Sequence, residues 1–346
     1  MKIPSQKIRS NIDLEWWGTS KSRIIDGKTF RGCEKLESIV IPDTTITIKK
    51  GAFKGCKNLK SIIIGKSVKN IEKRAFEDCT NLTSIIIPKS VTYIGDRAFN
   101  WCENLRNIII EGAIESIEKE TFAYCTNLES IVIPESVTTI KKRAFKDCIN
   151  MKRIVISKSV QNIEKLPFLN CENLSEIIVS PDNNYFSSKD GVLFNKTQDT
   201  LIAFPAKLST YTIPDTVTEI GKYAFINCIN LQSVTLGNSV TTINDLAFLG
   251  CLNLKKVVFQ NSLISIGNQS FMYCKNLQSI TIPNSVTTIG ESAFFACWKL
   301  KHITIGEGIT SIGSNTFSYC FALEKIEIPE RLNKIFKKVL DDNIWE

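Results

Sequence analysis

Cysteine recurs every 23 residues along almost the whole chain. Seven cysteines form a first series and five form a second series with the same spacing: Cys33, Cys56, Cys79, Cys102, Cys125, Cys148 and Cys171, then Cys228, Cys251, Cys274, Cys297 and Cys320. A phenylalanine three residues before each cysteine keeps the same period. All 12 cysteines of the 346-residue chain belong to these series. Such regularity predicts a solenoid, in which each repeat packs mainly against its two neighbours.

Each repeat contains a short alternating run of β-branched residues that ends at Pro or Gly, as in Ser84–Pro88. This period of two predicts a strand of about three or four residues. Equivalent strands would pair in a parallel ladder, about 4.8 Å apart. Their central residues give 13 strands, at positions 40, 63, 86, 109, 132, 155, 178, 212, 235, 258, 281, 304 and 327.

The inward positions of a repeat predict a core that neighbouring repeats share. In the third copy these positions are Leu82, Ile85, Ile87, Val91, Ile94, Ala98, Phe99 and Cys102. The segment Asp96–Phe99 is expected to return the chain through a short helical or 3₁₀ turn.

The pattern Leu-x-x-Ile-x-Ile-Pro-x-Ser-Val-Thr-x-Ile-Gly-x-x-Ala-Phe-x-x-Cys-x-Asn resembles the BspA-like, Treponema-type leucine-rich repeat. The resemblance covers roughly residues 20–335. It implies an α/β repeat fold, a curved leucine-rich-repeat solenoid with a parallel β ladder of about 13 rungs. Members of this family are often surface proteins of bacteria and some protozoa, associated with adhesion and binding of host proteins. The family has no common catalytic residues.

We predict a single leucine-rich-repeat domain over residues 1–346. It comprises an N-terminal cap at 1–23, repeats at 24–329 and a capping helix at 330–346. Leu14, Trp16 and Trp17 are expected to close the first end, with a carbohydrate platform as the alternative for the two tryptophans. The helical spacing of Leu332, Ile335, Phe336, Val339 and Leu340 predicts the amphipathic helix at the other end.

One step of the ladder, from position 178 to 212, is 34 residues long and lacks the Ala-Phe-x-x-Cys segment. Lys189-Asp190-Gly191 is a turn signal, and apolar runs follow at Val192–Phe194 and Leu201–Pro205. We therefore predict a β-hairpin insert at 181–210 that projects from the solenoid. It would serve either as a neutral spacer or as part of a binding face, because insertions in solenoids often lie on that face.

The cysteines are predicted to be buried free thiols. Equivalent residues of adjacent repeats lie one strand spacing apart, farther than the Cβ separation of a disulfide. The sequence contains no Cys-x-x-Cys, so zinc ribbons are not expected. Nine of the cysteines are followed two residues later by an Asn that is expected to satisfy backbone groups in the turn: Asn58, Asn81, Asn104, Asn127, Asn150, Asn173, Asn230, Asn253 and Asn276.

Nothing in the sequence indicates an enzyme, a cofactor or a metal site. The chain has one histidine, His302, which falls in an exposed row and is expected to be an ordinary surface residue. We find no nucleophile elbow, phosphate loop or metal-ligand spacing. The preferred function is therefore a non-enzymatic protein-binding module. The alternative is an intracellular scaffold or regulatory subunit that uses the same face.

The central side chain of each predicted strand faces away from the core. In the first seven strands it is aliphatic: Val40, Ile63, Ile86, Ile109, Val132, Val155 and Ile178. In the later strands it is mostly Thr. We predict that this aliphatic stripe binds a protein ligand or a second copy of the chain. The alternative is that Ile and Val are present only because they suit strands.

The net charge of +8 lies in the first half of the chain, where residues 49–74 hold nine Lys or Arg and only Glu72 opposes them. A secondary basic ridge is expected beside the return segments, formed by Lys50, Lys73, Arg74, Arg97, Lys119, Lys142 and Arg143. It would steer an acidic partner, or simply be a solvated face. Nucleic acid or another polyanion is not the expected partner.

No apolar run is long enough to span a membrane, and no signal peptide is visible. The family resemblance favours the cell surface or secretion. A cytoplasmic location is expected instead if Met1 is the native start.

Overall fold

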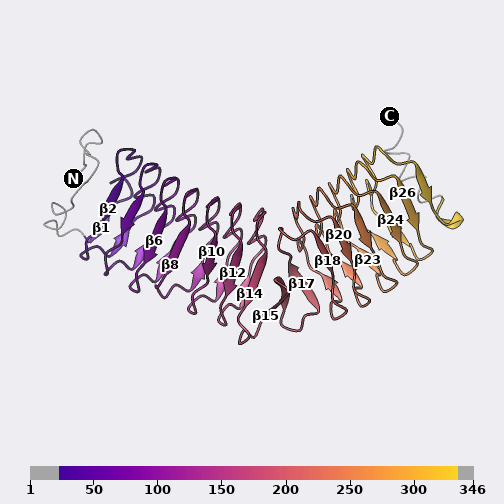
Figure 1. Cartoon of the computed structure of the whole chain (residues 1–346), viewed down its shortest axis with the longest axis horizontal. Coiled ribbons are helices and arrows are strands. Elements are labelled where there is room, and N and C mark those ends of the chain that lie inside the picture. Colours follow the sequence, from indigo (N-terminus) through magenta and orange to yellow (C-terminus); the bar gives the residue numbers. More distant parts are fainter. Residues whose placement is uncertain (1–22, 334–346) are drawn as a thin grey trace. The chain divides into compact units, whose positions relative to one another are not determined.

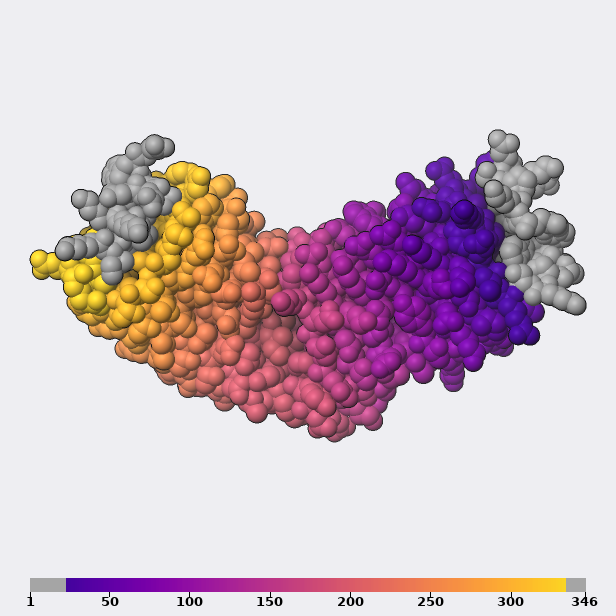
Figure 2. Space-filling view, turned by 180° about the vertical axis from the view of Figure 1, so that it is seen from behind, coloured from indigo at the N-terminus to yellow at the C-terminus, as the bar shows by residue number. Residues whose placement is uncertain are grey.

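The computed structural model describes residues 23–333. The chain divides into two compact units, Met1–Tyr185 and Phe186–Glu346. Each unit is a parallel β-solenoid, and the two contribute about 13 repeats (Figure 1). Within each unit, successive repeats follow one another in sequence order along the surface, as the colour gradient in the space-filling view shows (Figure 2). The prediction of one domain is not tested by this division and stays a prediction.

The predicted strands form what we call the front ladder. In the first unit its strands are β2 (Ser38–Val40), β4 (Ser61–Ile63), β6 (Ser84–Ile87), β8 (Asn107–Ile110), β10 (Ser130–Val132), β12 (Arg153–Ile156) and β14 (Glu176–Val179). In the second unit they are β18 (Thr210–Thr212), β20 (Ser233–Thr235), β22 (Lys256–Val258), β24 (Ser279–Ile282), β26 (His302–Ile305) and β28 (Lys325–Glu327). Each paired strand lies exactly one repeat from its partner, as Ile86 does from Ile109.

Each repeat also has a second strand of two residues, which the sequence analysis missed, and these form the back ladder. In the first unit it contains β1 (Ile24–Ile25), β3 (Thr47–Ile48), β5 (Asn70–Ile71), β7 (Tyr93–Ile94), β9 (Ser116–Ile117), β11 (Thr139–Ile140) and β13 (Asn162–Ile163). In the second unit it contains β19 (Glu219–Ile220), β21 (Thr242–Ile243), β23 (Ser265–Ile266), β25 (Thr288–Ile289) and β27 (Ser311–Ile312). A strand of two residues is too short to show an alternating pattern, so a search for alternation does not detect it.

The insert contains a β-hairpin that turns at Asp190-Gly191, as predicted, but the hairpin is part of a sheet and does not project from the solenoid. Strand β15 (Phe186–Lys189) pairs antiparallel with β16 (Val192–Asn195), and β16 pairs antiparallel with β17 (Thr200–Ala203). Strand β17 then pairs parallel with β19. The insert therefore begins the eight-stranded back sheet of the second unit. Three apolar side chains of the insert are buried in that unit's core: Val192, Phe194 and Leu201. Their burial holds the insert against the sheet.

The return segment is not helical, contrary to the prediction. Its N–H groups alternate between two kinds of acceptor: Ala98 and Cys102 donate to the carbonyl three residues earlier in the same repeat, whereas Phe99 donates to Thr121 of the next repeat. Arg97 and Trp101 have φ of 57° and 62°, in the left-handed region. A helix cannot continue through such residues, because each breaks the right-handed run of dihedral angles.

The one helix that lies completely within residues 23–333 is the 3₁₀ helix η1 (Glu330–Leu332). Leu332 is buried and packs at the end of the second unit's core. The remainder of the predicted capping helix, and the predicted N-terminal cap with Leu14, Trp16 and Trp17, lie outside the described residues. The described part of the chain contains no helix that is long and apolar enough to cross a bilayer.

A column of stacked phenylalanine rings runs through each core. In the first unit the rings extend from Phe30 to Phe168 with centroids 4.9–6.1 Å apart. In the second they extend from Phe204 to Phe317 with centroids 4.5–5.6 Å apart, and the Phe204 ring is tilted by 30° against that of Phe225. Phe204 comes from the insert and takes the place of the missing Ala-Phe segment. Offset-stacked pairs at this spacing stabilise beyond the burial of their area.

The cysteines form a second internal column, and all 12 are free, as predicted. All are buried except Cys33, which is half-buried. Most donate the S–H to the carbonyl of the phenylalanine 26 residues earlier, as Cys102 does to Phe76 at 3.2 Å. The thiol therefore fills a small apolar space and also satisfies a buried carbonyl.

The asparagines two residues after the cysteines behave differently in the two units. In the first unit most of them form a side-chain ladder, in which Asn104 donates to Asn81 and Asn127 donates to Asn104 at 3.1–3.2 Å. In the second unit Asn230 and Asn253 donate to backbone carbonyls instead. The prediction that these residues satisfy the backbone is thus confirmed for the second unit and wrong for most of the first.

Candidate functional site

The aliphatic stripe is exposed along most of its length. The relative exposures of its first five members are 53% for Val40, 63% for Ile63, 56% for Ile86, 55% for Ile109 and 67% for Val132. The residues on either side in each strand point inward, as Ile85 and Ile87 do. The alternation of the strand therefore fixes the stripe on the front surface of the first unit.

The last two members of the stripe, Val155 and Ile178, are half-buried. Two residues before them on the same face lie Arg153 and Glu176, whose side chains form an ion pair at 3.6 Å. At the equivalent place in earlier strands lie small exposed residues such as Ser61 and Ser84. The accessible part of the stripe thus extends over five strands, β2 to β10, and charged side chains bound it at the C-terminal side.

A groove opens in the stripe between β4 and β6. Strand β4 pairs with β2, and β6 pairs with β8, but no ladder joins β4 to β6. The groove has a volume of about 670 Å³. Its lining includes Ile63, Ile86 and Pro88, with Lys66 and Lys89 at one margin. We call it the lysine-flanked groove.

The predicted basic ridge lies in the return segments, away from the front face. Three of its seven members are paired with carboxylates: Lys73 with Asp96 at 3.6 Å, Arg74 with Glu77 at 3.7 Å and Arg97 with Glu120 at 2.6 Å. The hydrogen bond from Arg97 to Glu120 raises the pKa of Arg97. These pairs reduce the positive potential that the sequence suggests. The other four members are Lys50, Lys119, Lys142 and Arg143.

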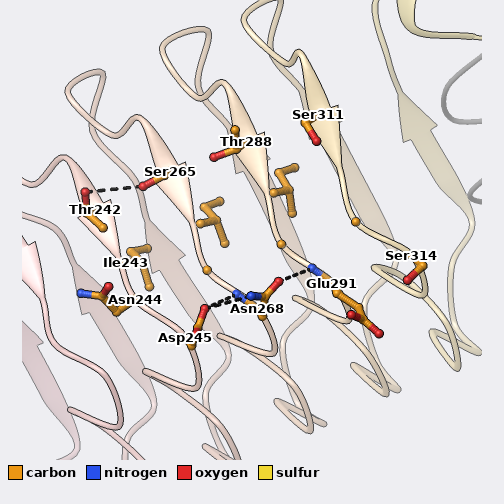
Figure 3. Close-up of a pocket in the computed structure, with 15 residues that line it drawn as sticks. Thr242, Ile243, Asn244, Asp245, Ser265, Asn268, Thr288, Glu291, Ser311 and Ser314 are labelled. Atoms are coloured by element: carbon orange, nitrogen blue, oxygen red, sulfur yellow. Dashed lines mark hydrogen bonds between the residues drawn. The ribbon is translucent and has the colours of Figure 1, made fainter.

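The back face of the second unit carries a shallow polar groove of about 480 Å³ (Figure 3). Hydroxyl side chains from four back strands line one side: Thr242, Ser265, Thr288 and Ser311. Along the other side Asp245 accepts from the backbone and side-chain nitrogens of Asn268, and Asn268 accepts from the backbone of Glu291. These bonds tie consecutive repeats together, so the row has a structural role.

Glycines let consecutive repeats approach closely along this back groove. A Cβ at Gly290 would lie 2.5 Å from the backbone nitrogen of Asn268, and one at Gly313 would lie 2.3 Å from that of Glu291. No larger residue fits these positions without displacing the neighbouring repeat. In the first unit, ion pairs such as Glu118–Lys141 at 2.8 Å occupy the corresponding surface.

The second unit also exposes an aromatic cluster that the sequence analysis missed. Phe295 contacts Tyr273 and Tyr319, with ring centroids 6.0 and 4.9 Å away, and Tyr319 contacts Phe321 at 5.8 Å. Phe321 is 75% exposed. Tyr273 and Tyr319 share one column of the repeat, whereas Phe295 and Phe321 come from two other columns, so only the folded chain brings the four together.

His302 is exposed at the start of β26 and pairs in register with Ser279 and Lys325. The described residues contain no group of three or more His, Cys, Asp or Glu side chains placed to hold a metal ion.

The sequence matches the BspA type leucine-rich repeat region in six copies, over residues 23–148, 93–210 and 199–324. Among solved structures, it is 33% identical to a leucine-rich cell surface protein from Faecalibacterium prausnitzii, with a TM-score of 0.71 over 86% of this chain and 81% of that one. It is 27% identical to the pneumococcal vaccine antigen PcpA, with a TM-score of 0.63 over 89% of this chain and 77% of that one.

A leucine-rich repeat protein from Bacteroides ovatus is 26% identical, with a TM-score of 0.60 over 93% of this chain and 86% of that one. No curated protein matches the sequence. The family match spans nearly all of the described residues and agrees with the motif that runs through every repeat. The chain therefore belongs to the BspA-type leucine-rich repeat family.

Proposed function

We propose that this chain is a non-enzymatic protein-binding module, and that its ligand lies on the aliphatic stripe of the first unit. The observation that carries the proposal is the exposure of five aliphatic side chains at the same position of five consecutive front strands, with Val40 in register with Ile63 and Ile86 in register with Ile109. A contiguous apolar surface of this kind on a folded protein commonly marks an interaction site. Either another protein or a second copy of the chain would cover it.

The second unit argues against strand propensity as the whole explanation. Its front strands have Thr212, Thr235, Thr281 and Thr304 at the equivalent positions. Threonine also suits strands, so the fold does not require an aliphatic residue there. The seven aliphatic residues of the first unit are thus a property of that surface rather than of the ladder.

We place this activity at a cell surface, in adhesion or host interaction. The support is the similarity to the cell surface protein from Faecalibacterium prausnitzii. The free thiols do not weigh against this location, because burial raises the pKa of thiols such as Cys79 and Cys297 well above the ordinary value. A buried, protonated thiol is a poor nucleophile and resists oxidation in any compartment.

The test is the double variant Ile86→Asp and Ile109→Asp, screened against an array of purified proteins that includes the chain itself. The matched control is Thr212→Asp with Thr281→Asp, at the same position of the second unit. We expect the stripe variant to lose the interactions that the wild type and the control retain, while its melting temperature barely changes. If the stripe variant binds the same proteins as the wild type, the proposed site is wrong.

A further inference from the structure

We propose that the lysine-flanked groove takes an acidic segment of the partner, which inserts an apolar side chain between Ile63 and Ile86 and places carboxylates against Lys66 and Lys89. The inference rests on the proposed function, because it names the chemistry of the partner at that same face. It concerns the first of the two places in the stripe where neighbouring front strands are not paired, between β4 and β6; the second lies between β8 and β10.

The shape of the groove suits an inserted side chain. Where front strands are paired, as β2 with β4 and β6 with β8, the ladder holds adjacent side chains at its own spacing. The groove of about 670 Å³ lies where β4 and β6 are not paired, and residues of both strands line it. Its apolar members Ile63 and Ile86 are 63% and 56% exposed, so much of their surface is available to a partner. An apolar group buried there would be removed from water on both sides.

The charged residues of the groove favour a partner that carries negative charge. Lys66 and Lys89 follow the stripe residues by three positions, so both lie at the same margin of the groove. Both side chains are exposed, and neither forms an ion pair with any residue of 23–333. Glu111 is the single carboxylate in the lining. The groove therefore offers two cations and one anion beside an apolar surface.

Another lysine in the same column of the repeat forms an ion pair. Lys158, at the equivalent position three repeats beyond Lys89, pairs with Glu135 at 3.0 Å. Asp43, one repeat before Lys66, has a carboxylate oxygen 2.7 Å from the backbone nitrogen of Lys66, from which it accepts a hydrogen bond. The ammonium groups of Lys66 and Lys89 are thus the unmatched charges of this column. Complementary carboxylates on a partner would set its orientation and accelerate its encounter.

The experiment uses the full chain and two labelled peptides of equal length, one alternating Leu with Glu and the other alternating Leu with Lys. Fluorescence anisotropy measures the dissociation constant of each. We expect the wild type to bind the acidic peptide about tenfold more tightly, as two partly exposed ion pairs allow. The preference should shrink as salt is raised, because exposed charges are screened.

The charge-reversal variant Lys66→Glu with Lys89→Glu should invert the preference and favour the basic peptide. The control Lys256→Glu with Lys299→Glu makes the same change in net charge on exposed lysines of the second unit, and should keep the wild-type preference. Replacing Ile63 with Ser should weaken both peptides. The inference is overturned if the control loses the preference equally, or if the groove variant keeps it.

Failure of this inference is distinguishable from failure of the proposed function. If a protein found on the array is released by Ile86→Asp with Ile109→Asp but not by the lysine variant, the stripe binds protein and the acidic-segment assignment is wrong. If neither variant changes binding, the proposed function and the acidic-segment assignment are both wrong.

Discussion

The two units share a core and differ on their surfaces. Each has a phenylalanine stack, a column of free cysteines and two parallel ladders. On the front face the first unit displays Ile and Val where the second mostly displays Thr. On the back face the first unit has the Glu118–Lys141 ion pair in a groove of about 310 Å³, whereas the groove of about 480 Å³ in the second unit is lined by glycines and neutral polar side chains beside Asp245 and Glu291. The inward positions therefore specify the solenoid, and the outward positions are free to specialise for recognition.

The largest expected effect is shared by both units and depends on pH. Burial raises the pKa of these thiols: Cys33, Cys56, Cys79, Cys102, Cys125, Cys148, Cys171, Cys228, Cys274, Cys297 and Cys320. For Cys56 and Cys320 the pKa reaches about 12. In the unfolded chain the pKa of a cysteine thiol is about 8.5.

Because the folded state holds these protons more tightly, its stability is complete below the unfolded pKa and falls as pH rises above it. Each thiol contributes a slope of about 1.4 kcal/mol per pH unit between the two pKa values. Urea unfolding measured between about pH 7 and about pH 10.5 should show a steep loss of the free energy of unfolding above about pH 9. Cys79→Ser and Cys297→Ser should each reduce that slope by one proton. A stability that is flat with pH would contradict the role assigned to burial.

The next effect compares the two cores directly. Phe122 and Phe248 are fully buried and stacked on both sides. Replacing either with Ala removes a large apolar side chain and leaves a cavity, at a cost of about 3–5 kcal/mol. Chemical denaturation with a spectroscopic readout for each variant measures the loss. A loss confined to one unit's variant would show that the two cores are not equivalent.

A smaller effect on stability, with a large effect on binding, is expected when the front face of the first unit is made like that of the second. Ile63→Thr, Ile86→Thr and Ile109→Thr together keep β-branched residues at exposed strand positions, so the free energy of unfolding should change by less than ~1 kcal/mol. Binding of any partner found on the array should be abolished. Retained binding would remove the aliphatic stripe from the account.

The last comparison concerns the back face and a modest effect on stability alone. The carboxylate of Glu118 accepts hydrogen bonds from Lys141 and Ser116, and its side chain is largely buried. Glu118→Gln should cost about 1–2 kcal/mol, because it removes a charge-assisted hydrogen bond. The exposed Glu291 of the second unit has no ion pair among the described residues, and Glu291→Gln should change stability by less than ~0.5 kcal/mol. Equal losses, measured by urea unfolding, would contradict this contrast.

The front ladder and the core could be predicted because each depends on a residue that recurs with a fixed period. Phe99 and Cys102 mark the inward positions, and Ile86 marks an outward one, since a strand alternates its faces. The exposure of Val40 to Val132 followed from the same rule. Strand alternation says which side a residue faces, and needs no knowledge of its neighbours.

The missed features depend on interactions between repeats. The two-residue strand Tyr93–Ile94 exists only because the neighbouring repeat pairs with it, so it has no pattern of its own. Arg97 and Trp101 adopt left-handed backbone conformations, which Gly and Asn adopt more readily. Their residue types therefore gave no signal for these turns. The interruption between β4 and β6 occurs in repeats whose sequences resemble their neighbours. The lysine-flanked groove therefore could not be read from the sequence.

The most direct test of the central claim is amide hydrogen exchange of the full chain with and without a bound protein partner from the array. The account predicts protection in the front strands of residues 38–132, and unchanged exchange in the front strands of residues 210–327. Protection confined to the second unit, or to the return segments that carry the basic ridge, would contradict it.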